Sequence, residues 1–283
     1  MKLRYAPLLA LVFFAGSAVA QSDTLRISLQ DAEKQFLQKN LMLLAAQYNI
    51  DANKALIEQA KLWDNPVLVT DQNVYADHKW FAHGKNETTG EPEGQFFIQI
   101  QQLIKTAGKR GKLINLATTT ASMSELQFKD VLRNLKYQLR SDYYTLTQLS
   151  GNQKLYQQVL DQLTILHNGM QQQLNAGNIS LKEYIRVQAL VMGLQQDMTD
   201  NIKQFNDVQT ELKTLLGDST NAFIEPIRID TTLETGSILL DTLLNQAREN
   251  NPLYLLQKMQ VVYQQQNLAY QKALKVPDIL VGP

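Results

Sequence analysis

The side chains that most often carry chemistry are few in this sequence and do not cluster. The histidines His78, His83 and His167 have no acidic partner at metal-ligand spacing, although His78 and His83 share a region where a weak external metal site stays open. There is no cysteine, so thiolate ligands and disulfides are excluded. The carboxylates are scattered, and no hydrolase, zinc-protease or phosphate-loop motif is present. We therefore predict no catalytic residue, no resident metal and no cofactor.

A basic, glycine-punctuated segment is the densest charge cluster. It runs from Lys105 to Lys112 and contains Gly108, Lys109 and Arg110. Such a cluster could bind lipid headgroups or phosphate. We favour the simpler interpretation, a solvated joint between two structural segments.

The N-terminus predicts export from the cytoplasm. Residues 1–20 combine a charged start, a short apolar run and an Ala-x-Ala cleavage pattern, which is typical of a signal peptide. The formal net charge is zero, so nothing indicates nucleic acid binding. No later segment reads as a membrane-spanning helix, so we expect a periplasmic, secreted or outer-membrane β-strand protein.

Residues 67–104 read as a β-hairpin with a long polar tip, made of strands at 67–82 and 95–104. In the second strand Phe96, Ile98 and Ile100 form one wholly apolar face, and the alternating positions are mostly glutamine. A period of two with one apolar face suits a strand that faces lipid or a core on one side and water on the other.

Residues 105–217 read as a long helical hairpin, with helices over about 113–174 and 181–216. Coiled-coil spacing marks the first helix, in alternating steps of three and four. Gly151 is a candidate kink within it. The tight turn lies at 175–180, with Gly177 as the left-handed cap, and Ser180 with Glu183 forms a capping box.

The sequence also contains an internal duplication. Residues 28–69 align with residues 239–280 at a constant offset of 211 positions, which matches Leu29 with Leu240, Asn40 with Asn251 and Pro66 with Pro277. We assign helices to 21–66, an irregular connector to 218–238 and the start of the second copy to 239–283. Because the second copy stops early, we expect this chain to be roughly the first two thirds of a longer protein.

In order and spacing these motifs resemble the outer membrane efflux proteins, the TolC-like family, over residues 25–283. The resemblance rests on the repeat opening at Ile27–Asn40, on Trp63–Pro66, on the strand-to-helix passage at Ile98–Arg110 and on the turn at Ala176–Arg186. It implies a mainly α fold, in which a long coiled-coil hairpin accompanies two strands given to a trimeric outer-membrane β-barrel.

The resemblance also implies a function and partners. Such a chain would be a homotrimeric exit duct without enzyme activity, which docks on a periplasmic adaptor protein connected to an inner-membrane pump. By position, the adaptor-docking residues would lie at the helical-hairpin tip: Ala176, Gly177, Asn178, Ile179, Ser180 and Glu183. Phe96, Ile98 and Ile100 would face lipid, and Gly108, Lys109 and Arg110 would lie at the barrel–tunnel junction.

The sequence departs from the family pattern, because it has one predicted strand pair and one complete helical hairpin. Three copies would give six strands, too few for the usual twelve-stranded barrel. The alternative is a periplasmic adaptor-like coiled-coil scaffold, although the Gly-rich β-domains typical of adaptors are missing from the flanks.

Overall fold

The computed structural model describes residues 24–76, 79–81, 84–85, 87–91, 94, 96–227 and 239–282. The predicted signal peptide, His78, His83 and most of the predicted connector lie outside these residues. The chain forms two compact units. Unit 1 contains Met1–Leu44 and Leu132–Thr235, and unit 2 contains Ala45–Val131 and Gly236–Pro283.

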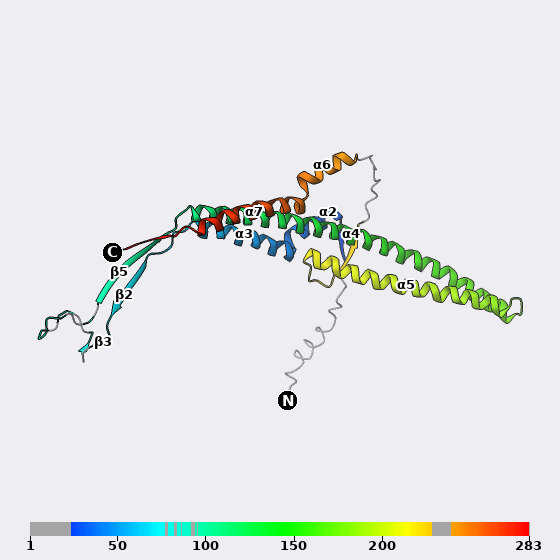
Figure 1. The fold of residues 1–283 in the computed structure, drawn as a ribbon. Coiled ribbons are helices and arrows are strands. Elements are labelled where there is room, and N and C mark those ends of the chain that lie inside the picture. Colours follow the sequence, from blue (N-terminus) through cyan, green and yellow to red (C-terminus); the bar gives the residue numbers. More distant parts are fainter. Residues whose placement is uncertain are drawn as a thin grey trace, which may run out of the picture. The chain divides into compact units, whose positions relative to one another are not determined.

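Unit 1 is built on two antiparallel helices, the C-terminal part of α4 (Lys109–Asn175) and α5 (Leu181–Leu216), shown in Figure 1. The predicted stripe on α4 is confirmed, because every one of its apolar members is buried or half-buried: Leu132, Leu135, Leu139, Leu146, Leu149, Tyr156, Leu160, Leu163, Met170 and Leu174. A matching stripe on α5 recurs in the same steps of three and four: Tyr184, Val187, Val191, Leu194, Met198, Asn201, Phe205, Val208, Leu212 and Leu215. Side chains repeating every 3.5 residues on both helices allow one seam to stay buried along the hairpin.

The helix α4 differs from expectation at two places. It begins at Lys109, so the second half of the basic segment is already helical. It also continues without interruption through Gly151, where a kink was expected. A glycine inside a helix costs conformational entropy but leaves the hydrogen-bond ladder intact, so packing of the stripe is enough to keep the helix continuous.

The open end of the hairpin is covered by α2 (Leu29–Lys39), and the side chain of Ser28 caps this helix by accepting a hydrogen bond from the Asp31 amide. Ala32 and Phe36 of α2 are fully buried. Beside it lies a two-stranded parallel sheet that the sequence analysis missed, β1 (Thr24–Ile27) with β6 (Phe223–Pro226). The hydroxyl of buried Tyr143 donates to the backbone oxygens of Ile27 and Ile227, at 3.1 and 2.7 Å. The expectation of an irregular connector is therefore wrong for its first part.

Unit 2 combines helical segments with a three-stranded sheet. Lys54 of α3 (Leu41–Lys61) pairs with Glu125 of α4 at 2.9 Å. On α4, Thr119 donates to Gln266 of α7 (Pro252–Leu274) at 2.7 Å. The sheet has the order β2 (Val67–Gln72), β5 (Phe96–Ile104) and β7 (Ile279–Val281), and both pairings are antiparallel.

The predicted strand at 67–82 is shorter than expected. It ends at Gln72, and a separate small hairpin follows, β3 (Tyr75–Ala76) with β4 (Lys79–Trp80). Asp71 and Asn73 are poor strand formers, which explains the early end. The third strand, β7, was not predicted, because the sequence alone does not show its pairing with β5.

The helices of the two aligned segments begin at equivalent positions. The helix α6 (Leu240–Asn250) begins and ends 211 positions after α2, and α7 begins 211 positions after α3. Asn40 and Asn251, between the helices of each pair, have nearly the same backbone angles, with φ of −68° and −74°. The proposed division of the chain into functional segments stays a prediction.

Asp142 interrupts the buried stripe of α4, and its burial destabilises the folded state. Asp142 is buried, and one of its carboxylate oxygens accepts a hydrogen bond from Gln138 at 2.7 Å. The other oxygen has no hydrogen-bond partner among the described residues. Burial, and then the negative charge of Glu211, raise the pKa of Asp142 above its ordinary value.

We predict that Asp142→Asn stabilises the protein at neutral pH by roughly 1 kcal/mol, because it removes a buried charge and keeps the acceptor for Gln138. A carboxyl whose pKa is raised by folding favours the folded state below its unfolded pKa. That contribution is lost as the pH rises through the folded pKa. Chemical denaturation between pH 4 and 8 should therefore show wild-type stability falling relative to the variant. A variant less stable than wild type at pH 7 would contradict this account.

Candidate functional site

The tip of the helical hairpin in unit 1 is closed by local hydrogen bonds. Gly177 has a φ of +74°, and its amide donates to Leu174 O at 3.0 Å. The Asn178 amide reaches Gln173 O at 2.9 Å. These two bonds form a Schellman motif, in which a left-handed residue satisfies the last carbonyls of a helix. The predicted role of Gly177 as the left-handed cap is confirmed.

The second helix of the hairpin begins with the predicted capping box. Ser180 Oγ accepts from the Glu183 amide at 3.3 Å, and the Glu183 carboxylate accepts from the Ser180 amide at 2.9 Å. The hydrogen bonds from the Ser180 backbone and side chain hold the pKa of Glu183 below its ordinary value. Glu183 is therefore a charged group with a fixed position at the start of α5.

The tip also presents apolar side chains to solvent. Leu181 and Ile185, in the first turns of α5, are 60% and 50% exposed, and Ile179 is half-buried. The backbone of the turn is fixed by the motifs on both sides of it. The tip is therefore a preformed surface with an apolar centre and one carboxylate, which suits it to bind another protein.

In β5 of unit 2, the apolar side chains of one face are more exposed to solvent than the glutamines of the other face. Phe96, Ile98 and Ile100 are 57%, 58% and 56% exposed, whereas Gln99 and Gln101 on the other face are half-buried and joined by a 2.9 Å hydrogen bond. The register places Leu68 of β2 opposite Ile100, which extends the exposed apolar face to a second strand. All three residues of β7 are also exposed and apolar. Contiguous exposed apolar surface of this kind marks contact with lipid or with another protein.

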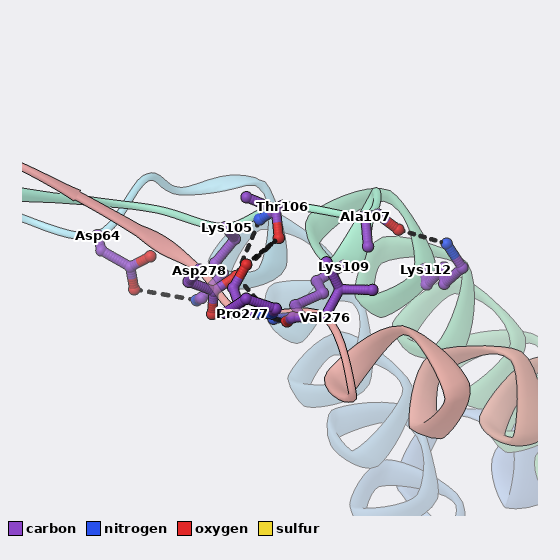
Figure 2. A network of polar contacts seen from close by, with 9 residues as sticks. All are labelled: Asp64, Lys105, Thr106, Ala107, Lys109, Lys112, Val276, Pro277 and Asp278. Carbon is purple, nitrogen blue, oxygen red and sulfur yellow. Dashed lines mark hydrogen bonds and ion pairs between the residues drawn. The ribbon is translucent and has the colours of Figure 1, made fainter.

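The strand–helix junction of unit 2 holds a buried ion pair, shown in Figure 2. Lys109, only 5% exposed, donates through Nζ to Asp278 Oδ1 at 2.7 Å and to Val276 O at 2.6 Å. The same carboxylate oxygen accepts from the Thr106 amide at 2.9 Å. The hydrogen bond from Lys109, followed by that from Thr106, lowers the pKa of Asp278. The start of α4 is thus tied to the segment that leads into β7.

The other basic residues of this segment also have internal partners. Lys105 pairs with Asp64 at 3.0 Å, and Lys112 donates to Ala107 O at 2.6 Å. Arg110 donates to Lys61 O, and its guanidinium lies 4.5 Å from the centre of the Trp63 ring. The expectation of a solvated basic joint is therefore wrong for Lys109, which is buried, and for Arg110, which is half-buried, whereas Lys112 bonds within its own turn. Gly108 has a φ of +64° and makes the turn into α4.

The residues that the structure describes contain neither a metal-binding cluster nor a membrane-spanning helix. No three His, Cys, Asp or Glu side chains there lie close enough to hold a metal ion. Among the same residues, no helix is both long and apolar enough to cross a membrane. His167 lies in the helix–helix seam, with its ring 5.0 Å from that of Tyr184.

Sequence reasoning missed Asp278 and Tyr143, which organise the junction and the β1–β6 sheet. Both act on residues more than 80 positions away in the chain. Asp278 does follow Pro277 at a position where the first repeat has Val67. That difference between the repeats was the one feature of the sequence that could have indicated the role of Asp278.

Comparison with known proteins identifies relatives of this architecture. A family model described as "Outer membrane efflux protein" matches residues 33–218. No curated protein sequence matches the chain significantly.

Solved structures match over nearly the whole chain at low sequence identity. A membrane protein from Pseudomonas aeruginosa has a TM-score of 0.73 at 15% identity, over 92% of this chain and 60% of that one. The CmeC outer membrane channel of Campylobacter jejuni has a TM-score of 0.70 at 12% identity, over 90% and 55%. The outer membrane protein VceC of Vibrio cholerae has a TM-score of 0.64 at 14% identity, over 90% and 61%. The fold is thus shared, and the chain spans about three fifths of the length of these relatives.

We predict that Lys109→Met loosens the attachment of β7, because Asp278 loses its charged partner and Val276 O its donor. Hydrogen exchange of the peptide that contains Ile279–Val281 should accelerate by about tenfold. Lys112→Met is the matched control, because Lys112 bonds only within its own turn. In wild type the contribution of Asp278 should be lost as the pH falls through its lowered folded pKa. Equal exchange in the two variants would show that the ion pair does not hold the strand.

Proposed function

The chain belongs to the outer membrane efflux protein family, and from this premise we propose that it is a subunit of a passive exit duct. The family is one of outer-membrane channels, so the predicted resemblance and the localisation to the outer membrane of a Gram-negative bacterium are confirmed. In this proposal solutes pass from the periplasm, or from an inner-membrane pump, to the exterior. The chain itself catalyses no reaction, and the energy comes from the pump.

The exposed apolar face of the sheet is the observation that carries the proposal. Phe96, Ile98 and Ile100 of β5 and the neighbouring Leu68 of β2 are exposed, and the opposite face of β5 carries Gln99 and Gln101 as well as Phe97. A lipid-facing strand needs this alternation, because lipid contacts one face and the polar side chains of the other face meet water. In this proposal three copies assemble, and β2, β5 and β7 of each copy contribute to one shared barrel.

The helical-hairpin tip is the proposed docking site for a periplasmic adaptor protein. Ala176, Gly177, Asn178, Ile179, Ser180 and Glu183 would form it, together with the exposed Leu181. The preformed turn supports this role, because a surface that is rigid before binding loses little conformational entropy on association. The seam between α4 and α5 holds the tip at the end of a stiff support.

The first test concerns insertion of the sheet. Ile98→Asp together with Ile100→Asp places two carboxylates on the apolar face, and we expect the outer-membrane fraction of the exported chain to fall by roughly tenfold. The control is Gln99→Asp together with Gln101→Asp, which places the same charges on the amide face. Recovery is measured after detergent extraction of separated membranes. Wild-type chain found wholly in the soluble periplasmic fraction would contradict insertion and favour the coiled-coil scaffold.

The second test concerns the tip. We expect Leu181→Asp to weaken cross-linking to a co-expressed periplasmic adaptor by roughly tenfold, because it places a charge in the apolar centre of the contact. Asp suits the first turn of a helix, so α5 should still form. Leu190→Asp is the matched control, since Leu190 lies on the same helix and is also 60% exposed. If both variants cross-link like wild type, the tip does not bind the adaptor.

A further inference from the structure

Two neighbouring cavities lie where the helices of unit 2 meet its strands. The larger has a volume of about 660 Å³ and is lined by α3, α4 and α7, and the smaller, of about 240 Å³, lies between the end of α3 and the start of α4. The larger volume is within the range of pockets that hold small-molecule ligands. Five residues line both cavities, which therefore adjoin each other: Leu62, Trp63, Asp64, Lys105 and Arg110.

One face of each helix lines the larger cavity. Its lining residues on α4 stand at positions i, i+3, i+4 and i+7, and those on α3 and α7 follow the same spacing, which places each set on a single helix face. Most of these side chains are aliphatic or aromatic, and the main ones are Leu56, Ala60, Leu113, Leu116, Tyr263 and Tyr270. This part of the cavity is therefore suited to an apolar ligand body.

The charged residues that line the cavity, among those the structure describes, all lie at its strand end. Asp64 stands three positions before β2, Lys105 follows β5 directly, and Arg110 is the second residue of α4. Figure 2 shows Asp64 and Lys105 where the strands meet the helices. Thr120, which also lines the cavity, lies about 15 Å further along α4 than Arg110. The cavity thus has a charged end beside the strands and an apolar body along the helices.

The positive charge of Arg110 is not balanced at this end. Asp64 is the one acid among the described residues that line either cavity, and it already pairs with Lys105 at 3.0 Å. Half-buried Arg110 has neutral partners in the described part of the chain, the backbone oxygen of Lys61 and the ring of Trp63. Its Nε is buried and has no hydrogen-bond partner there. Because a partly buried charge without a counter-charge is unfavourable, an anion beside Arg110 would be bound favourably.

We propose that this cavity binds a small organic anion, which combines an aliphatic or aromatic body with a carboxylate or sulfonate group. The anionic group would accept hydrogen bonds from the guanidinium of Arg110, and the body would fill the apolar part between α3, α4 and α7. The indole of Trp63, which is 63% exposed, would contact the ligand at the boundary of the two cavities. The site is built from unit 2 alone and goes beyond the proposed duct function.

The direction of the cavity favours a ligand from water over a lipid of the bilayer. A lipid with its head group at Arg110 would have its acyl chains along the strands, where the proposed membrane lies. The apolar part of the cavity extends from Arg110 in the other direction, along the helices. A soluble amphiphile can fill it, whereas a bilayer lipid in its usual orientation cannot. This choice between the two sources rests on the proposed function, and the binding site itself does not.

Trp63 provides a direct reporter of binding, because the chain has two tryptophans. Trp80→Phe leaves Trp63 as the single one, and the full chain with this change is purified in a non-ionic detergent. We expect its fluorescence to change saturably on titration with octanoate at pH 7. Octanamide, which has the same body without the charge, should bind at least about tenfold more weakly, because a hydrogen bond to a charged group is lost. Octylammonium should not bind.

Two variants separate the contribution of the charge from that of the cavity. Arg110→Met should weaken octanoate binding by about tenfold. Lys112→Met is the matched control, because Lys112 bonds to Ala107 O, lines neither cavity and carries the same charge two positions away. Ala117→Phe keeps Arg110 and places a ring in the cavity, so it should also weaken binding by about tenfold. Thermal unfolding of each variant shows whether it is folded.

The outcomes separate this proposal from the duct function. Equal affinity for octanoate and octanamide, or binding that survives both Arg110→Met and Ala117→Phe, overturns the proposal. An equal loss in Lys112→Met overturns it as well. Phosphatidylglycerol in mixed micelles should leave the octanoate affinity unchanged, and competition by this lipid would overturn the assignment to a soluble ligand. Failure of the duct function would be seen in the membrane fraction of the Ile98→Asp, Ile100→Asp chain, which leaves this cavity unchanged.

Discussion

The seam between α4 and α5 is the interaction on which unit 1 depends. A single helix of such length has no core of its own, and most helical stability in proteins comes from packing of an apolar face. Both helices repeat their buried positions every 3.5 residues, so one continuous seam forms from the tip to the covered end. The tip motifs satisfy backbone groups at one end of the hairpin. At the other end, Gln35 of α2 and Asn40 donate to Leu216 O and Leu215 O of α5.

Buried polar groups in the two units differ in how much they destabilise the folded state. Lys109 in unit 2 is buried but has a carboxylate and a carbonyl as partners, so its charge organises the junction. Asp142 is buried with one oxygen unpaired, and Asn201 on the facing stripe also has an unpaired buried oxygen among the described residues. Polar residues in a coiled-coil seam reduce stability, but they can specify which residues of the two helices face each other. The two residues are therefore candidates for setting the register of the hairpin.

The sequence predicted local structure well and long-range pairing poorly. The stripe on α4, the Ser180–Glu183 box and the Gly177 cap depend on residues that are close in the chain, and all of them are confirmed. The β1–β6 pair and the partners of Lys109 depend on residues more than 160 positions apart, which no periodicity reveals. The basic segment was misread for this reason, because charge composition predicts solvation and only tertiary contacts show burial. The apolar face of β5 was found from its period of two, and its exposure agrees with that pattern.

The shared seven-residue period of the two helices limits how the hairpin can change in length. An insertion of one or two residues in one helix would turn the stripe residues that follow it out of the seam, whereas three or four extra residues would locally change the supercoil. An insertion in one helix alone would shift it against its partner. Matched heptads added to both helices leave the seam unchanged and move the tip in steps of roughly 10 Å. Homologous hairpins of different reach should therefore differ most often by multiples of fourteen residues.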